Sequence, residues 1–291
     1  MGKGYPIPKK ELLKNIKDVS GIISLLSDKI DSSVIDSMSN CKVIANYAVG
    51  FNNIDVQYAR QKGITVTNTP DVLTDSTADV AMGLALACAR RFYEGENLVR
   101  KNKFKGWAPK LLLGIELKNK IFGIVGAGRI GIATAIRAKA FGCKIIYTSN
   151  SAKKDFEVST GAKKVSLNTL LKKADFISLH VPMNEKTFHL LNKERLALLK
   201  ETAVLINTAR GEVVDEKELI KILKKKKIFA AGFDVYENEP AINPKLMKLN
   251  NVILLPHLGS ATFETREAMA LLAAKNVDAV LAGRKPITPV Y

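Results

Sequence analysis

The fold of this 291-residue chain is decided by residues 121–148, which read IFGIVGAGRIGIATAIRAKAFGCKIIYT. An apolar run is followed directly by three glycines, an alanine-rich segment and a second apolar run; the glycines are Gly126, Gly128 and Gly131. Glycines at this spacing allow a tight turn, close approach of the backbone to a pyrophosphate and close packing of the next helix. The stretch therefore predicts a strand at 121–125, a dinucleotide-binding turn, a helix and a strand at 144–148.

Further short apolar runs continue this pattern toward the C-terminus. We expect strands at 176–181, 204–208, 230–235 and 252–255, each apolar almost throughout, as in strands that are buried on both faces. One intervening helix has a clear start, because Asp215 is a good N-cap and Glu218 follows at the capping-box position. These features predict an α/β fold, with a doubly wound parallel sheet of about six strands in a Rossmann-type domain.

The first hundred residues carry a weaker version of the same pattern. Short candidate strands at 21–26, 42–47 and 64–68 predict a second, smaller α/β domain. The segment 78–100 opens with Ser76 and Asp79 in capping-box spacing and is apolar on almost every side, so we expect a buried helix at the domain junction. Residues 264–281 predict a last helix, which we expect to pack back on the first domain.

Composition indicates a soluble globular protein. It is 47% hydrophobic and contains no apolar run near the roughly 20 residues that a membrane span requires. The N-terminal lysines are not followed by the apolar region of a secretory signal, so we expect a cytoplasmic protein without membrane partners. Cys41, Cys88 and Cys143 are odd in number and far apart, which argues against both a disulfide framework and a metal site.

The net charge of +17 raises the question of nucleic-acid binding, because a basic surface attracts phosphates. The lysines are scattered over helix faces, however, with only one short block at 224–227. This pattern is typical of a solvated, lysine-rich surface that also favours anionic substrates and cofactors. We expect no specific nucleic-acid partner.

The end of the strand at 144–148 bears on the choice between NAD and NADP. An Asp or Glu about 20 residues after the glycine turn often binds the ribose of NAD. This sequence instead has Ser149, Asn150 and Ser151, with Lys153 and Lys154 nearby. Without a carboxylate a 2′-phosphate is not repelled, and these hydroxyl, amide and ammonium groups can bind it. The sequence therefore favours NADP(H), with NAD(H) as the alternative if these are ordinary loop residues.

Three polar residues follow strands that should end at one edge of the sheet. His257 ends the last predicted strand, and Arg210 and Glu239 follow two others. An arginine can bind a carboxylate through two parallel hydrogen bonds, and a carboxylate beside an imidazole stabilises its protonated form for proton donation. We therefore interpret Arg210 as a substrate clamp, His257 as an acid and Glu239 as its partner. His180 also ends a strand and is assigned to the cofactor cleft, whereas His189 is expected on the surface.

These stretches together resemble the D-isomer-specific 2-hydroxyacid dehydrogenase family, and within it glyoxylate/hydroxypyruvate reductases. The resemblance covers nearly the whole chain. It rests on the glycine turn, on the intervals between Arg210, Glu239 and His257, and on the segments IANYAVG (44–50), NTPDVLTD (68–75), TARG (208–211), FDVYENEP (233–240) and PHLGSAT (256–262).

The resemblance implies that the chain reduces a small 2-oxo acid, glyoxylate or hydroxypyruvate, to its D-2-hydroxy acid by hydride transfer from NAD(P)H. Arg210 would bind the substrate carboxylate and polarise its carbonyl, His257 would be the general acid, and Glu239 would hold His257. Alternatives within the family are phosphoglycerate or D-lactate enzymes. Some relatives are dinucleotide-sensing corepressors that bind proteins, but the complete set of three residues favours an enzyme over these and over a nucleic-acid binder.

The resemblance also assigns contacts. Backbone amides around Val49 and Gly50 would hold the substrate carboxylate, and Trp107 would help to close the substrate pocket unless it is a plain packing residue. Asp234 would contact the nicotinamide amide. The complete set of expected cofactor-binding residues is Gly126, Ala127, Gly128, Arg129, Ile130, Ser149, Asn150, Ser151, His180, Thr208, Ala209 and Asp234.

The resemblance finally implies a homodimer and a division into three segments. These are a flavodoxin-like substrate domain over residues 1–92, a dinucleotide-binding domain over 93–265 and a C-terminal helix over 266–291 that returns to the substrate domain. Family members usually begin with an additional strand and helix before the part that aligns with Pro6 to Leu13. We therefore expect the substrate domain to lack its usual first strand and helix.

Overall fold

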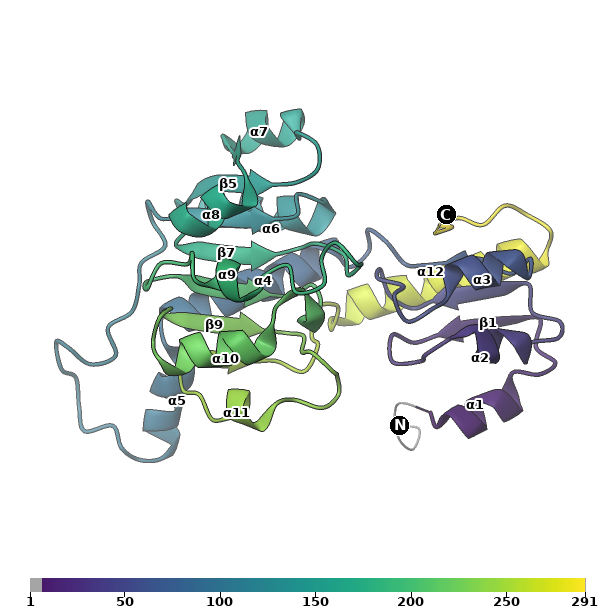
Figure 1. Cartoon of the computed structure of the whole chain (residues 1–291), viewed down its shortest axis with the longest axis horizontal. Coiled ribbons are helices and arrows are strands. Elements are labelled where there is room, and N and C mark those ends of the chain that lie inside the picture. Colours follow the sequence, from purple (N-terminus) through teal and green to yellow (C-terminus); the bar gives the residue numbers. More distant parts are fainter. Residues whose placement is uncertain (1–6, 291) are drawn as a thin grey trace. The chain divides into compact units, whose positions relative to one another are not determined.

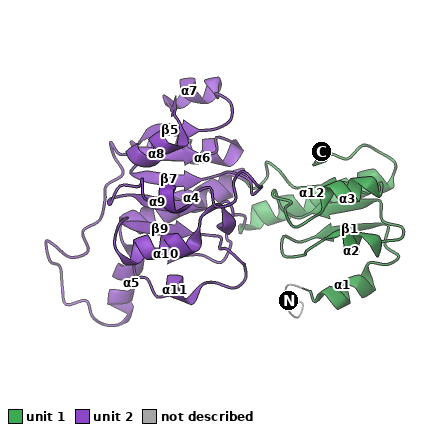
Figure 2. Ribbon diagram, in the orientation of Figure 1, with its two compact units in different colours: residues 1–73, 261–291 green, residues 74–260 purple. Residues whose placement is uncertain are grey.

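The computed structural model describes residues 7–290 and forms two compact units (Figures 1 and 2). Unit 1 contains the described residues up to Leu73 and from Ala261, and unit 2 contains Thr74–Ser260. The boundaries thus differ from those expected at residues 92 and 265. The reason is that helix α4 (Thr74–Ala89), expected to lie before the second domain, packs on strands and a helix of unit 2.

Unit 2 is built on a seven-stranded sheet in the order β10-β9-β8-β7-β4-β5-β6, in which every pair is parallel. The six predicted strands are present, most of them shorter at the C-terminal end than expected. The strands are β4 (Ile121–Val125), β5 (Lys144–Thr148), β6 (Lys163–Lys164), β7 (Phe176–Leu179), β8 (Val204–Asn207), β9 (Ala230–Phe233) and β10 (Val252–Leu254). Strand β6 was not expected, because its two exposed lysines carry no apolar pattern.

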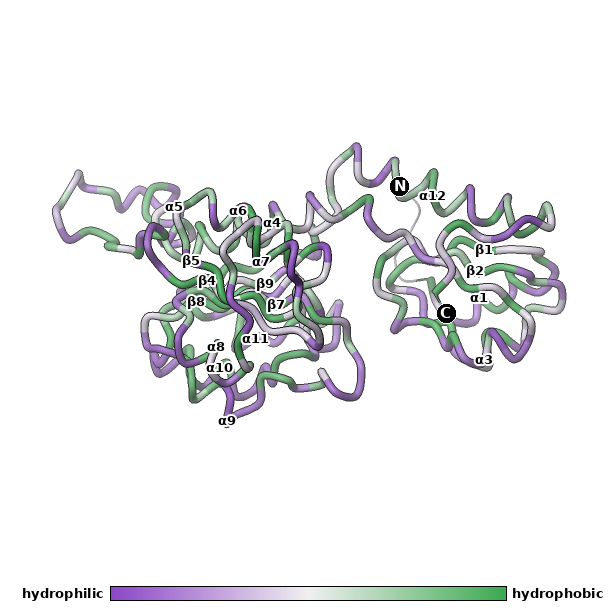
Figure 3. Tube along the Cα trace, turned by 90° about the horizontal axis from the view of Figure 1, so that it is seen from above, coloured by the Kyte–Doolittle hydropathy of each residue, from purple (hydrophilic) through white to green (hydrophobic). Residues whose placement is uncertain are grey.

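The sheet is buried on both faces, because alternate residues of its strands enter two separate cores. In β7, Phe176 joins the core formed with α4 and α6, whereas Ile177 joins the core formed with α8 and α10. The central strands are accordingly among the hydrophobic parts of the trace in Figure 3. The remaining helices of unit 2 are α5 (Phe92–Arg100), α6 (Arg129–Ala140), α7 (Lys154–Thr160), α8 (Leu167–Lys173), α9 (Lys193–Leu196), η1 (Gly211–Val213), α10 (Glu216–Lys224) and α11 (Pro244–Met247).

Two helix starts test the capping arguments. Asp215 caps α10 as predicted, with its side chain accepting a hydrogen bond from the Glu218 N–H at 3.0 Å. The continuous helix expected at 78–100 is wrong. The observed helix begins earlier, so that Ser76 is buried inside α4, and it ends before α5, where Arg91 has φ 56° in the left-handed region and the Ala89 carbonyl accepts the Ile115 N–H at 2.8 Å.

Unit 1 has a parallel three-stranded sheet, β1 (Gly21–Ser24), β2 (Val43–Asn46) and β3 (Thr65–Thr67), in that order. Its helices are α1 (Lys9–Asn15), α2 (Ser32–Asp36), α3 (Val56–Gln61) and α12 (Phe263–Leu281). Helix α12 packs against all three strands, which explains why the C-terminal segment belongs to this unit. The three cysteines are buried and unbonded to one another. Among residues 7–290, no helix has the length and apolar character needed to cross a membrane.

Candidate active site

The glycine turn lies between β4 and α6, at the carboxyl end of β4, which pairs with β7 and β5 in the sheet of unit 2. Gly126 has φ 100°, and a Cβ atom there would lie 2.7 Å from the His180 carbonyl oxygen. A Cβ on Gly131 would lie 2.2 Å from the Gly126 carbonyl oxygen. Gly128 caps α6, and the space around its missing Cβ is open. The first and third glycines are therefore required by packing, whereas the second leaves room beside a helix N-terminus, the arrangement that suits a phosphate.

The end of β5 carries the polar segment expected to contact the ribose. The Ser149 hydroxyl donates to the Ser151 carbonyl, and the Lys164 ammonium donates to the Asn150 carbonyl at 3.3 Å. The carboxylate of Glu157, which lies beside β5, accepts the hydroxyl of buried Tyr147 at 2.6 Å. Lysine and hydroxyl groups thus occupy this strand end without an acidic residue in the segment 149–151.

Two other predicted cofactor contacts have unusual surroundings. Thr208 follows β8, and its buried hydroxyl oxygen has no hydrogen-bond partner among the described residues, so it is available to a ligand. His180 follows β7, where desolvation lowers the pKa of the imidazole to about 3 and keeps it neutral at pH 7. Its Nε2 atom lies 2.8 Å from the Ser178 hydroxyl. Together with the open space at Gly128, the orphaned hydroxyl fits a bound dinucleotide.

Arg210 is held in a turn at the end of β8. Buried Asn207 fixes this turn, because its side chain donates to the Arg210 carbonyl at 2.9 Å and accepts the Ala209 N–H at 3.0 Å. The guanidinium donates to the Ala209 carbonyl at 2.7 Å. Desolvation lowers the pKa of Arg210 from its ordinary value and the charges of Glu239 and Glu212 oppose this, so the side chain remains a cation.

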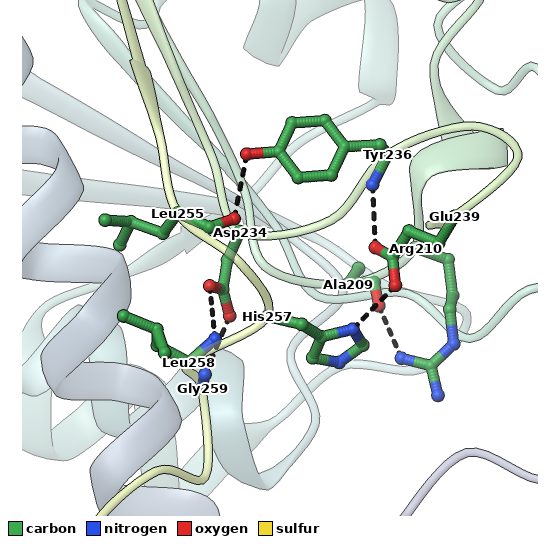
Figure 4. A network of polar contacts seen from close by, with 9 residues as sticks. All are labelled: Ala209, Arg210, Asp234, Tyr236, Glu239, Leu255, His257, Leu258 and Gly259. Carbon is green, nitrogen blue, oxygen red and sulfur yellow. Dashed lines mark hydrogen bonds and ion pairs between the residues drawn. The ribbon is translucent and has the colours of Figure 1, made fainter. Parts of the chain in front are cut away.

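Glu239 joins its own loop to His257 (Figure 4). One carboxylate oxygen accepts the Tyr236 N–H at 2.8 Å, and the other lies 2.9 Å from Nδ1 of His257. Desolvation would raise the pKa of the Glu239 carboxyl, but the hydrogen bond and charge of His257, the Tyr236 N–H and the charge of Arg210 together hold it below its ordinary value. With Nδ1 bound to a carboxylate, Nε2 is the ring atom left to exchange a proton with a ligand.

Asp234 fixes the turn that carries His257. Its buried carboxylate accepts the N–H groups of Leu258 and Gly259 at 2.6 and 2.7 Å, and its backbone carbonyl accepts the His257 N–H at 3.0 Å (Figure 4). Burial raises the pKa of Asp234, while the two N–H groups oppose the shift. Both carboxylate oxygens are thus bound within the chain, so any contact with a nicotinamide amide would use their remaining lone pairs.

The predicted site residues outside this cluster have different settings. Val49 and Gly50 belong to unit 1, where the side chains of Asn68 and Asn46 donate to their carbonyl oxygens, each at 2.8 Å. Trp107 belongs to the segment that follows α5 and is 84% exposed, so the plain packing role does not hold within a single chain. The parts that these residues play in substrate binding stay predictions.

His189, expected on the surface, is 28% exposed, and its Nε2 atom has an unforeseen partner, Glu237 Oε1, at 3.0 Å. No sequence signal links residues that lie 48 positions apart in two loops. The structural roles of Asn207 and Tyr236 were also not predicted, although Asn207 directly precedes the segment 208–211 and Tyr236 lies within the segment 233–240. Among the described residues, no group of His, Cys, Asp or Glu side chains is arranged to hold a metal ion.

The arrangement at this edge of the sheet can bind an anionic group at Arg210 and exchange a proton at His257, beside a turn that suits a dinucleotide. A family model described as "D-isomer specific 2-hydroxyacid dehydrogenase, NAD binding domain" matches residues 82–259, which is more than half of the chain. The match covers the glycine turn and the loops that carry Arg210, Glu239 and His257.

Known proteins resemble the chain over almost its whole length. It is 50% identical over 283 residues to the glyoxylate reductase of Thermococcus litoralis, which covers 96% of this chain and 86% of that protein. The crystal structure of the TT0316 protein from Thermus thermophilus matches with a TM-score of 0.93 at 45% identity, covering 99% and 91% of the two chains. An NADPH-dependent glyoxylate/hydroxypyruvate reductase from Sinorhizobium meliloti, solved with NADP and malonate, matches with a TM-score of 0.87 at 36% identity over 95% and 85%.

The glycine turn generates a prediction that separates packing from ligand binding. Gly131→Ala places a methyl group against the Gly126 carbonyl and should lower the free energy of unfolding by about 1–3 kcal/mol. It should also weaken dinucleotide binding, because the turn has to shift. Gly128→Ala meets no atom, so it should lose less than about 1 kcal/mol, the cost of alanine at an N-cap, while the affinity for the nicotinamide dinucleotide falls at least about tenfold, because its methyl group enters the space left for a phosphate. Urea unfolding and nicotinamide fluorescence titration measure the two effects. Equal stability losses in both variants would contradict the packing argument.

Proposed function

This chain belongs to the D-isomer specific 2-hydroxyacid dehydrogenase family, and we propose that it reduces glyoxylate, with hydroxypyruvate as a second substrate, at the expense of NAD(P)H. The observation that carries this proposal is the 2.9 Å contact between Glu239 and Nδ1 of His257, with the cation of Arg210 close enough to affect the same carboxyl group. The choice of glyoxylate is supported by the glyoxylate reductase that shares half of its residues with this chain.

In this proposal the residues of the chain perform three tasks. The Arg210 guanidinium binds the carboxylate of the 2-oxo acid and polarises the adjacent carbonyl group. Nε2 of His257 donates a proton to the carbonyl oxygen as it becomes a hydroxyl group, and Glu239 stabilises the protonated ring through Nδ1. The nicotinamide, when bound, supplies the hydride. The glycine turn and Thr208 would hold the dinucleotide.

We further propose that NADPH is preferred to NADH. The segment Ser149 to Ser151 offers hydroxyl and amide groups instead of a carboxylate, and Lys164 lies against the Asn150 carbonyl. A 2′-phosphate would therefore meet donors and positive charge rather than repulsion. Exposed lysines contribute modestly, so the preference should be moderate.

We also propose that two copies associate through the segment that follows α5. In Figure 1 this segment extends away from the body of unit 2. Helix α5 and the segment together carry seven exposed apolar side chains, which are Phe92, Tyr93, Val99, Phe104, Trp107, Leu111 and Leu113. The same unit contains an open pocket of about 750 Å³, lined mainly by residues of α5 and β10 and by Leu112 of the segment itself. In a two-fold dimer the protruding apolar segment of each copy can fill the apolar pocket of the other.

The role of His257 as proton donor is tested by replacing it. His257→Gln should lower kcat for glyoxylate about 100-fold or more, because the amide cannot supply the proton that the product requires. The affinity for NADPH, measured by nicotinamide fluorescence, should stay within about twofold of the parent and serves as the control for folding. Near-normal turnover in the variant would refute the assignment. A parent enzyme that binds NADPH but reduces none of glyoxylate, hydroxypyruvate and pyruvate would refute the proposed activity itself.

The cofactor preference is tested by kcat/KM for NADPH and NADH at fixed glyoxylate. We expect a ratio on the order of ten in favour of NADPH, equivalent to about 1.4 kcal/mol. Ser149→Asp should shift the ratio toward NADH, because its carboxylate repels a phosphate and accepts ribose hydroxyls. Ser159→Asp, at an exposed serine near the end of α7, is the matched control and should leave the ratio unchanged. A parent that favours NADH would contradict the proposal.

The dimer is tested by sedimentation equilibrium at micromolar concentration. The parent should have twice the 31.8 kDa mass of the chain. Val99→Ser combined with Trp107→Ser should shift the population toward the monomer, because both changes remove apolar surface from the proposed interface. Val158→Ser changes an 87% exposed residue on α7 and should not. A monomeric parent, or a dimer that the double variant leaves intact, would contradict this interface.

A further inference from the structure

A second imidazole–carboxylate pair lies in the loops that carry the candidate active site. His189 and Glu237 are 28% and 24% exposed in their side chains, and Nε2 of His189 lies 3.0 Å from Glu237 Oε1. The ring of His189 stacks on Phe188, with ring centroids 4.1 Å apart and planes inclined by 14°. The imidazole is therefore fixed on one face by stacking and at Nε2 by the carboxylate.

Glu237 and Glu239 are two residues apart on one loop, and each binds a different histidine. Glu239 binds His257 at 2.9 Å, and Glu237 binds His189 at 3.0 Å. Between them Asn238 has φ 69°, in the left-handed region. The loop that presents Glu239 to the candidate acid is thus anchored two residues earlier by a contact of the same chemical type.

His189 also contacts the turn that carries Arg210. Its backbone N–H donates to the Glu212 carbonyl at 2.8 Å, and the Leu191 N–H donates to the Val213 carbonyl at 3.0 Å. Gly211 in the same turn lies so close to the other loop that a Cβ atom there would be 1.9 Å from the carbonyl carbon of Tyr236. His189 therefore holds the turn after Arg210 through its backbone and the loop of Glu239 through its ring.

We propose that His189 and Glu237 form a positioning pair that fixes the Glu239 loop against the Arg210 turn. Its contribution to turnover is through the geometry of the two loops. It rests on the proposed function, because positioning matters only if Arg210, Glu239 and His257 carry the reaction. A partly exposed pair adds little to stability, whereas small displacements of catalytic groups reduce turnover strongly.

The experiment compares His189→Leu, Glu237→Leu and the double variant. Each single change should lower kcat for glyoxylate about tenfold, with a smaller effect on KM, since the Glu239 loop loses one of its anchors while its contact through Tyr236 and the backbone bonds of the Arg210 turn remain. The double variant should be no slower than either single one, because both remove the same contact. His189→Gln, whose amide N–H replaces the ring donor, should recover most of the activity. Position 189 has φ 45°, where glutamine and leucine are similarly strained, so a difference in activity between these two variants reflects the side-chain contact.

A readout that does not depend on activity is the imidazole NMR spectrum, which is simple because the chain has three histidines. The His257 resonances should shift or broaden in Glu237→Leu and stay unchanged in Glu201→Leu. The control removes an exposed pair with Lys227, in which Glu201 is 75% exposed. Additive losses in the double variant, no recovery by His189→Gln, or unchanged His257 resonances would overturn the inference. Inactivity of the parent toward 2-oxo acids would instead refute the proposed function. The NMR comparison would still report whether the pair positions His257, so the two failures can be told apart.

Discussion

The backbone hydrogen bonds of unit 2 join its strands into a parallel sheet, which brings the carboxyl ends of all the strands to one edge. In a parallel sheet the carboxyl ends lie together, so residues that are far apart in sequence meet there without any contact designed for that purpose. The glycine turn after β4, the Arg210 turn after β8 and the Glu239 loop after β9 all follow from this one constraint. The two apolar cores that cover the faces keep ligands away from them and leave the edge as the accessible polar surface.

Within that edge, buried polar groups determine where the functional side chains point. Asn207 satisfies the backbone at the Arg210 turn, and Asp234 satisfies the N–H groups that follow His257. Each of these side chains would be costly to bury without partners, so the turn and the buried group stabilise each other. The candidate active site is therefore held by residues that need not touch the substrate, which explains how loops can hold reactive groups at defined distances.

The sequence was sufficient for the features that depend on local patterns. Continuous apolar runs predicted six strands of the large sheet, the glycines predicted the turn after β4, and Asp215 predicted the start of α10. It was insufficient where a backbone contact at a distance decides the local structure. At the break between α4 and α5 the chain turns at Arg91 and the Ala89 carbonyl binds the Ile115 N–H, a contact between distant residues that no local pattern predicts. Likewise, His189 lies between Phe188 and Leu190 in a loop without a recognisable motif, and its partner Glu237 is identified only when two loops fold together.

Backbone strain at the site fits the same account. His257 has φ 57°, and Asn238 and His189 also have positive φ values, a conformation that usually costs non-glycine residues on the order of 1 kcal/mol. At His257 the cost is offset by three hydrogen bonds from residues 257–259 to Asp234. At His189 the ring contacts Glu237 and the backbone contacts Glu212. Strained residues persist only where their surroundings fix them. The carboxylates at this edge therefore hold the strained backbone conformations of the site, and each depends on the other.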